Sequence, residues 1–297
     1  MAMGAADVVP GVSGGTIAFI SGIYEELIST ISGVKLSLIK TFKEEGFGAM
    51  WKELNGNFII ALFSGILISV FTVMRLANYL LENHPILIWS FFFGLVIASI
   101  WYVGKQIPKW DLKAVIALIL GAALAYFIVS LPGLSENTSI PFLFFAGAIA
   151  ICAMILPGIS GAFILVLLGA YKTITEAAHD FDFKTLAIFG AGAIFGLLTF
   201  SKILKWLFVH YSTLTLAVLT GFIAGSLKKI WPWKEVLETE IFGDKEVVVK
   251  EAIVLPWNYE GDPQSLAAIS LMLAGFFLIL ILEWVATKKP VEMDGTN

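Results

Sequence analysis

The chain alternates between long apolar stretches and short polar ones. A helix that spans a bilayer needs ~20 predominantly apolar residues, and six uninterrupted stretches come close to that length. The predicted spans lie near residues 58–81, 86–104, 112–131, 185–209, 212–230 and 265–286. A polar insertion, 231–264, separates the last two spans, and its sequence "EIFGDKEVVV" predicts a small β-hairpin outside the membrane.

Two further apolar stretches, 1–30 and 141–176, are interrupted by nearly the same phrase. Residues 8–16 read "VVPGVSGGT" and residues 155–162 read "ILPGISGA". Proline removes a backbone donor and clashes with the preceding turn, and glycine weakens a helix interior. Each stretch is therefore predicted to form two short helices that meet at an unwound turn. The predicted helix breaks are Pro10, Gly11, Pro157 and Gly158.

The two Pro-Gly phrases belong to a longer internal repeat. The alignment that places Pro10 on Pro157 also pairs Ile17 with Ile164, Gly22 with Gly169, and Tyr24 with Tyr171. A second alignment, in another register, pairs Gly65 with Gly192, Thr72 with Thr199, Leu80 with Leu207, Arg75 with Lys202, Gly94 with Gly221, and Ser99 with Ser226. A longer loop in the first half, 31–57, accounts for the change of register. The predicted fold class is an all-α polytopic membrane protein with two repeats, 1–140 and 141–297, each with one broken segment and three spans.

The relative orientation of the repeats depends on how the broken segments, 1–30 and 141–176, meet the membrane. If each is a re-entrant hairpin that enters and leaves on one face, three crossings separate the hairpins and the repeats are inverted. If each segment crosses fully, four crossings intervene and the repeats are parallel. Only nine residues precede Pro10, too few to cross alone. We therefore favour two re-entrant hairpins and an inverted-topology repeat.

Composition supports the membrane assignment. Of the 297 residues, 58% are hydrophobic and 14% are charged, whereas soluble domains carry about a quarter charged residues. The sequence has no basic stripe of the kind that binds nucleic acid. Its one cysteine, Cys152, lies in an apolar run and is interpreted as a packing residue, so no disulfide framework is expected. The N-terminus has no signal-peptide pattern.

Lysine positions give an orientation. The loops 31–57 and 104–113 and the C-terminal tail carry lysines, and all three fall on one side in this topology. Since positively charged loops favour the cytoplasm, we expect that side and both termini to be cytoplasmic. Lysines on the other side lie in or beside the long insertion, where this rule is weaker. They are Lys228, Lys229, Lys234, Lys245 and Lys250.

The broken segments offer the chemistry of an anion site. A helix that restarts after a break directs unpaired amides and the positive end of its dipole into the turn. Glycines let a ligand approach the backbone, and hydroxyl side chains add donors. The candidate phosphate-binding residues at the two turns are Ser13, Gly14, Gly15, Thr16, Ser160 and Gly161. The alternative interpretation is that these small residues only permit close helix packing.

Ionisable residues within the apolar stretches extend this site. Arg75 and Lys202 occupy equivalent repeat positions inside predicted spans, where an unpaired charge costs a few kcal/mol or more. We predict that both contact the anion, although long cationic side chains also reach toward the interface. Asp7 and Glu25 flank the first turn and are candidates for proton coupling or for pairing with a cation. The inventory indicates a phosphate or carboxylate site.

A hydrolytic enzyme is the rival from another class. The phrases "GVSG" and "GISG" fit the Gly-x-Ser-Gly pattern of intramembrane serine proteases. That chemistry needs a histidine within reach of the serine, and the histidines, His84, His179 and His210, lie at span ends or in loops. Cysteine, histidine and carboxylate spacing shows no metal-ligand pattern. We therefore expect no enzyme activity, no metal and no cofactor.

The phrases "MGAADVVPGVSGGTIAFISGIYEELI" and "ILPGISGAFILVLLGAYKTI" resemble the PopT-type polyprenyl-phosphate transporter family. The likeness is close at both motifs and extends over the arrangement of spans in nearly the whole chain. The resemblance implies a flippase for undecaprenyl phosphate, the carrier lipid of cell-wall synthesis. It also implies multi-pass placement in the bacterial cytoplasmic membrane, where the protein would return the lipid to the inner leaflet. The partners implied are the lipid and the bilayer.

Other functions stay open on the sequence alone. One is a transporter or channel for a small soluble anion, which would need a wet path at both faces and no lateral portal. Another is a membrane scaffold without transport activity, in which loss of Arg75 or of both motif serines would change stability alone. The residues also leave the oligomeric state open, a homo-oligomer included.

Overall fold

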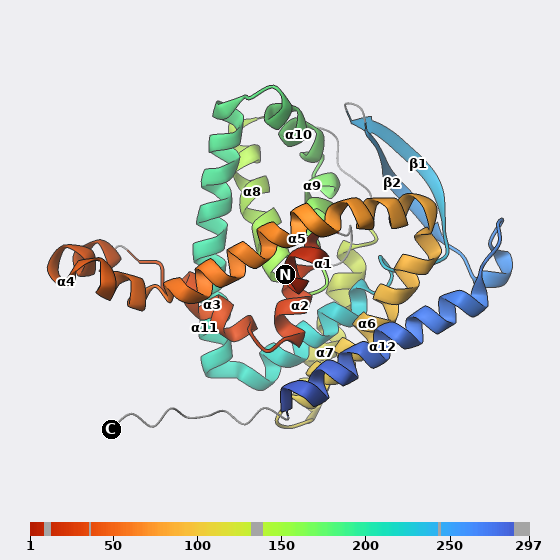
Figure 1. The fold of residues 1–297 in the computed structure, drawn as a ribbon, viewed down its shortest axis with the longest axis horizontal. Coiled ribbons are helices and arrows are strands. Elements are labelled where there is room, and N and C mark those ends of the chain that lie inside the picture. The colour runs from red at the N-terminus through yellow and green to blue at the C-terminus, as the bar shows by residue number, and fades with distance from the viewer. Residues whose placement is uncertain (9–12, 36, 132–138, 243–244, 288–297) are drawn as a thin grey trace.

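The computed structural model describes residues 1–8, 13–35, 37–131, 139–242 and 245–287, and this part is a bundle of α-helices with a two-stranded sheet at its edge (Figure 1). In chain order the elements are α1 (Ala2–Val8), α2 (Gly14–Ile20), α3 (Tyr24–Ser32), α4 (Ser37–Glu53), α5 (Gly56–Asn83), α6 (Pro85–Lys105), α7 (Leu112–Ile128), α8 (Ile140–Ile155), α9 (Gly161–Leu167), α10 (Tyr171–His179), α11 (Phe183–Ser226), β1 (Lys234–Phe242), β2 (Lys245–Ile253) and α12 (Ser265–Thr287).

The predicted spans all coincide with helices. α5, α6, α7 and α12 each cover one of them, and α11 covers two, 185–209 and 212–230, with a bend at Tyr211. By length and composition, three helices of the described chain can cross a membrane, or four if the bent pair α9–α10 counts as one span. α7 and α8 are shorter apolar helices. These helices confirm the coarse prediction of an all-α membrane protein.

The Pro-Gly phrases interrupt helices. Between α8 and α9, residues 156–160 are not helical, and α9 and α10 then meet at an angle of 110°. In the first copy α2 restarts at Gly14, whereas Pro10 and Gly11 lie outside the described residues. Pro157 and Gly158 lie in this non-helical segment.

Element boundaries recur in the registers of the sequence repeat. In the register that places Pro10 on Pro157, α9 and α10 begin and end at the positions equivalent to the ends of α2 and α3. The linkers contain the equivalent glycines Gly22 and Gly169, at φ of 74° and 68°. In the second register His84, the junction between α5 and α6 (φ −138°, ψ 50°), falls on Tyr211, the bend of α11 (φ −137°, ψ 41°). The two alignments therefore coincide with two sets of matching boundaries.

The prediction of a loop at 31–57 is wrong, because most of this segment is helix. α4 projects from the bundle (Figure 1) and contains an i,i+4 ion pair between Lys40 and Glu44, 3.8 Å apart. Gly46, at φ 83°, interrupts the helix. The difference between the two repeat registers suggested a longer loop here, but a segment of charged and apolar residues is also compatible with an exposed amphipathic helix.

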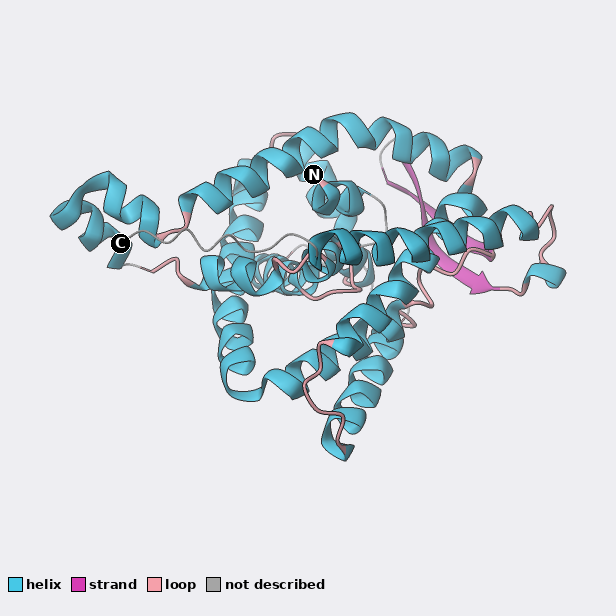
Figure 2. Ribbon diagram, turned by 60° about the horizontal axis from the view of Figure 1, so that its bottom comes forward, coloured by secondary structure: helices cyan, strands magenta, loops and turns pink. Residues whose placement is uncertain are grey.

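The polar insertion forms the expected hairpin. β1 and β2 pair antiparallel and lie at the edge of the helical bundle (Figure 2). Trp231 donates its indole N–H to the Val254 carbonyl at 2.9 Å, and Trp233 donates to the Pro263 carbonyl at 2.8 Å. Trp233 is buried against Ile86 of α6 and Ala268 of α12. The two indoles thus anchor the base of the hairpin where α6 and α12 begin.

Glycines set the closest helix contacts in the bundle. In several helix pairs, among them α6 with α12 and α7 with α11, a Cβ added at a glycine would collide with the facing backbone. In these two pairs the contacts are Gly94 with Met272, Gly275 with Phe91, Gly221 with Leu118, and Gly121 with Val218. Small residues that let backbones approach are a recurrent means of packing membrane helices. Each of these two pairs also joins a helix of the first half to one of the second.

We predict that Gly221→Val lowers the free energy of unfolding by about 1–3 kcal/mol, because the facing backbone at Leu118 cannot yield as a side chain does. Gly190→Val in the same helix is the matched control, since a Cβ at Gly190 meets no atom within 4 Å. Thermal denaturation of both purified variants in detergent measures the difference. Equal melting temperatures would contradict the packing role of Gly221.

Candidate functional site

The two helix breaks meet, and Ser13 is the first link between them. Ser13 is the N-cap of α2, and its Oγ accepts a hydrogen bond from the Gly15 amide at 3.1 Å. The same hydroxyl faces the carbonyl oxygens of Met154 and Leu156, at 3.4 and 3.3 Å, where α8 ends. Ser13 is 2% exposed. One buried hydroxyl therefore caps the restarting helix and contacts the backbone of the other break.

Two more hydroxyls of the first segment bind the second break. The Gly158 amide donates to Thr16 Oγ1 at 2.9 Å, and the Tyr24 hydroxyl donates to the Ile155 carbonyl at 3.1 Å. Both side chains are buried. Unwound backbone at membrane depth needs partners from the protein or from a wet cavity. Here side chains from residues far away in the sequence provide them.

The glycines at this contact leave no room for a side chain. A Cβ at Gly15 would lie 2.6 Å from the Ile155 carbonyl oxygen, so any side chain would separate the two breaks. Gly158 adopts φ 94°, a conformation that other residues rarely accept, and a Cβ there would lie 2.6 Å from Ser226 Oγ. Pro157 beside it is fully buried. The second break is thus packed between α2 and the last turn of α11.

The two copies of the motif differ in their contacts. Ser160 is the N-cap residue of α9 but its side chain makes no capping hydrogen bond, and it is half-buried. Gly161 lies against the Ala150 carbonyl, since a Cβ there would be 2.9 Å away. Phe163 occupies the repeat position of Thr16. The hydroxyls of the first copy bridge the breaks, whereas the second copy contributes backbone groups.

The predicted charged residues are either exposed or have side chains outside the described part of the structure. Lys202 is exposed on α11, and Glu25 is exposed in the first turn of α3. Arg75 lies in α5 and Asp7 in α1, but their side chains are outside the described part of the structure. The structure therefore brings together Ser13, Gly15, Thr16, Pro157 and Gly158.

Glu25 lines a small polar cleft that sequence reasoning missed. The cleft has a volume of about 240 Å³ and lies between α3 and α11, with Ser29, Lys205 and Ser212 among its lining residues. Its carboxylate and ammonium come from different halves of the chain. Tyr24 was also missed as a bridging residue, although its pairing with Tyr171 in the repeat marked both positions.

A large apolar cavity lies beside α2, the helix that follows the first break. Its volume is about 890 Å³, and it is bordered by α1, α2, α5, α6 and α12. Ile17 and Ile20 line it from α2, and Phe91 and Phe92 line it from α6. The polar residues among its described lining are Ser21, His84 and Tyr102. A cavity of this lining accepts a hydrocarbon chain rather than an ion.

These features define a class of protein. Apolar helices surround two broken segments, and side chains of one segment satisfy the unwound backbone of the other. This arrangement is typical of polytopic α-helical membrane transporters, which place irregular backbone only where the protein can satisfy it. The described residues hold no group of three or more histidine, cysteine or acidic side chains that could bind a metal.

Comparison with known proteins gives the family. The model of a family described as undecaprenyl phosphate translocase-like matches residues 3–247. A polyprenyl-phosphate transporter of Vibrio cholerae is 47% identical over 293 residues, which cover 97% of this chain and 95% of the relative. A polyprenyl-phosphate transporter of Staphylococcus aureus is 34% identical over 249 residues, 78% of this chain and 83% of the relative. No solved structure matches significantly. The chain belongs to the undecaprenyl phosphate translocase-like family.

We predict that Thr16→Val, which keeps the shape but removes the acceptor of the buried Gly158 amide, lowers the free energy of unfolding by about 1–3 kcal/mol. Thr175→Val is the control, because the Thr175 hydroxyl is exposed and bonds to carbonyls of its own helix. Thermal unfolding in detergent compares the two. If Thr16→Val has the same melting temperature as the wild type, the Thr16 hydroxyl does not stabilise the contact between the two segments.

Proposed function

We propose that the protein moves polyprenyl phosphate, specifically undecaprenyl phosphate, between the leaflets of the bacterial cytoplasmic membrane. The names of the Vibrio cholerae and Staphylococcus aureus relatives support this substrate. Return of the carrier lipid to the cytoplasmic leaflet would recycle it for cell-wall synthesis. The observation that carries the proposal is the apolar cavity of about 890 Å³ beside α2, the helix that follows the first break.

The cavity suits the isoprenoid tail. Its lining is dominated by aliphatic and aromatic side chains from α2, α5, α6 and α12, and burial of such surface is favourable by about 25 cal/mol per Å² when the alternative is water. In a bilayer the tail has no need of the protein for solubility, so the cavity would keep the tail beside the phosphate path. The phosphate is the part that needs help across the membrane, because an unpaired anion in hydrocarbon loses its hydration.

The helix breaks would replace that hydration. Hydroxyls, backbone amides and cations at mid-membrane are the groups that bind phosphate, and the proposed set is Ser13, Gly14, Gly15, Thr16, Ser160, Gly161, Arg75 and Lys202. Ser13 and Thr16 bond to the opposing break in the described conformation. We infer that the phosphate exchanges with these contacts, so that substrate binding and separation of the breaks are one event.

Alternating access would follow from the internal repeat. We propose that the two halves are inverted repeats with re-entrant hairpins at 1–30 and 141–176. The recurrence of helix boundaries in both repeat registers supports the repeat. Rocking of one half against the other about the paired breaks would expose the site to each leaflet in turn. Both chain termini would face the cytoplasm.

A leaflet-exchange assay with purified protein in liposomes tests the proposal. Wild-type protein should move labelled undecaprenyl phosphate, and inorganic phosphate at the same concentration should not compete. Ala77→Phe should reduce the exchange rate about tenfold or more, because Ala77 is buried against the cavity and a ring there would fill it. Ala123→Phe, on the exposed face of α7, is the matched control.

Two results would overturn the proposal. If wild-type protein fails to exchange the lipid, undecaprenyl phosphate is not its substrate. Efficient competition by inorganic phosphate, with Ala77→Phe as active as the wild type, would favour instead a transporter or channel for small soluble anions. The cavity would then have no part in transport.

We further propose that transport is coupled to protons through Asp7 or Glu25. The motivating observation is the cleft in which the Glu25 carboxylate lies between α3 and α11. Glu25→Gln should abolish the acceleration of lipid exchange by a pH gradient while leaving gradient-free exchange intact. Glu44→Gln, on exposed α4, is the control. An unchanged gradient response in Glu25→Gln would exclude Glu25.

A further inference from the structure

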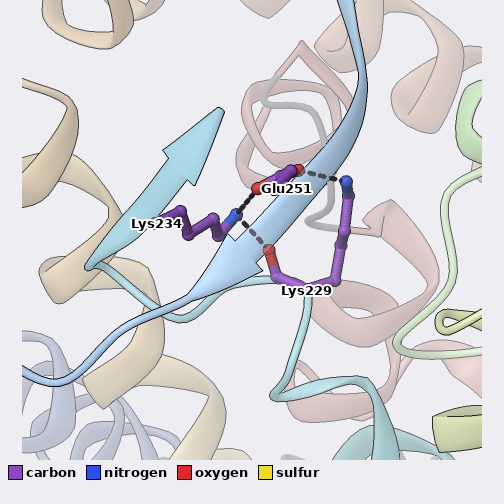
Figure 3. A network of polar contacts seen from close by, with 3 residues as sticks. All are labelled: Lys229, Lys234 and Glu251. Carbon is purple, nitrogen blue, oxygen red and sulfur yellow. Dashed lines mark hydrogen bonds and ion pairs between the residues drawn. The ribbon is translucent and has the colours of Figure 1, made fainter. Parts of the chain in front are cut away.

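Three lysines gather where the hairpin joins the bundle. Lys228 and Lys229 come two and three residues after the end of α11, and Lys234 begins β1; Figure 3 shows Lys229 and Lys234. Lys229 and Lys234 hold the two oxygens of one carboxylate, that of Glu251 on β2, at 2.5 and 3.0 Å. Their side chains are 23% and 11% exposed, and that of Glu251 is 20% exposed. The three side chains are therefore largely buried.

Positive charge exceeds negative charge in this group. Lys228 does not take part in the bridge to Glu251: its ammonium donates to Ser130 Oγ at 2.6 Å and lies 4.6 Å from the centre of the Tyr126 ring. The next carboxylate along β1, Glu235, follows Lys234, and successive strand residues point to opposite faces. The bridge thus joins two ammonium groups, those of Lys229 and Lys234, to one carboxylate, and Lys228 precedes Lys229 in the chain.

The pKa values of Lys234 and Glu251 reflect both their burial and the neighbouring charges. Burial lowers the pKa of Lys234 to about 8, and the charge of Lys229 adds to the effect while Glu251 opposes it. Burial acts to raise the pKa of Glu251, but the charges of Lys234 and Lys229 outweigh it and hold the pKa below its usual value. A second anion at this place would stabilise both ammonium groups.

The lysines lie next to the second helix break. Gly158 packs against Ser226, the last residue of α11, and the Lys229 amide donates to the Ser226 carbonyl at 2.9 Å. The Lys229 ammonium lies 5.1 Å from the centre of the Phe163 ring in α9. One turn of chain therefore separates the cations from the break. An anion held by the lysines would be positioned at the entrance to the proposed phosphate path.

We propose that Lys228, Lys229 and Lys234 form a capture site for the phosphomonoester head group of a lipid, and that Glu251 occupies the place of the phosphate until the lipid arrives. This inference rests on the proposed function and adds an entry site to it. The Glu251 carboxylate bridges two ammonium groups, which is also how a phosphate binds lysines. Since Glu251 belongs to β2, its displacement would couple lipid arrival to movement of the hairpin.

A purely structural role is the competing explanation. Lysines at the C-terminal end of a helix are favourable partners for its last carbonyls, and the Lys234 ammonium donates to the Lys229 carbonyl. Under that explanation the Lys229–Glu251–Lys234 bridge ties the hairpin to α11 and binds nothing. The two explanations differ on Lys228 and on Glu251, because Lys228 makes no contact with Glu251 among the described ion pairs.

Binding of labelled undecaprenyl phosphate to purified protein in nanodiscs tests the proposal. Lys229→Gln and Lys228→Gln should each weaken binding about tenfold, the loss of one charge-assisted hydrogen bond. Glu251→Gln should strengthen binding, because it removes the competing carboxylate. Lys43→Gln, an exposed lysine of α4, is the control. Melting temperatures of all variants report whether they remain folded.

Three outcomes would contradict the capture site or the proposed function. If Lys228→Gln and Glu251→Gln are folded and bind as the wild type does, the capture site is wrong while the proposed function stands. If wild-type protein neither binds nor exchanges the lipid, the proposed function itself fails. If inorganic phosphate competes at equal concentration, the lysines recognise soluble phosphate and the assignment to a lipid head group is wrong.

Discussion

The structure depends on a hydrogen-bonded contact between two interrupted helices. Three hydroxyls of the first segment, those of Ser13, Thr16 and Tyr24, bind backbone groups of residues 154–158 in the second. An interrupted helix exposes amides and carbonyls that hydrocarbon cannot satisfy. Backbone groups of residues 154–158 find partners in side chains of the first segment, so the described conformation of the second break depends on the first segment. The breaks thus require the two halves to meet, and the glycines at 15 and 158 allow that meeting.

The hydrogen bonds of this contact are few, so their total free energy is small enough for a ligand to replace them. Each hydrogen bond contributes about 1 kcal/mol net, but leaving its buried partner unpaired costs about 1–3 kcal/mol. A phosphate that satisfies the same groups could replace these contacts with little net change in free energy. In our account the apolar cavity beside α2 would hold the tail, and the lysines beside α9 would receive the head group. Gly158 of the second break contacts Thr16 of α2 and Ser226 at the end of α11.

Much of the helical architecture could be predicted from the sequence. Each span predicted from hydropathy coincides with a helix, and Pro157 and Gly158 lie in a non-helical segment. The two repeat alignments anticipated boundaries such as His84 and Tyr211, because a repeated sequence repeats its local backbone preferences. α4 was missed because a charged segment suits an exposed helix as well as a loop.

The site was less accessible to such reasoning. Sequence identified Ser13 and Thr16 as donors but not their partners, because a backbone carbonyl at residue 154 or 156 leaves no mark in the side-chain sequence. Glu251 was not recognised beside Lys229 for a similar reason: hairpin register, rather than spacing along the chain, brings them together. Lys202 was chosen for its repeat position, yet the structure leaves it exposed on α11.

The most direct test of the central claim is an experimental structure of the protein in a lipid nanodisc with undecaprenyl phosphate bound, at a resolution that shows side chains. The account predicts head-group density between the two Pro-Gly breaks, in contact with Ser13 or Thr16, and tail density in the cavity lined by α2, α5 and α6. Continuous helices through residues 8–16 and 155–162, or breaks that lie apart and face only hydrocarbon, would contradict it.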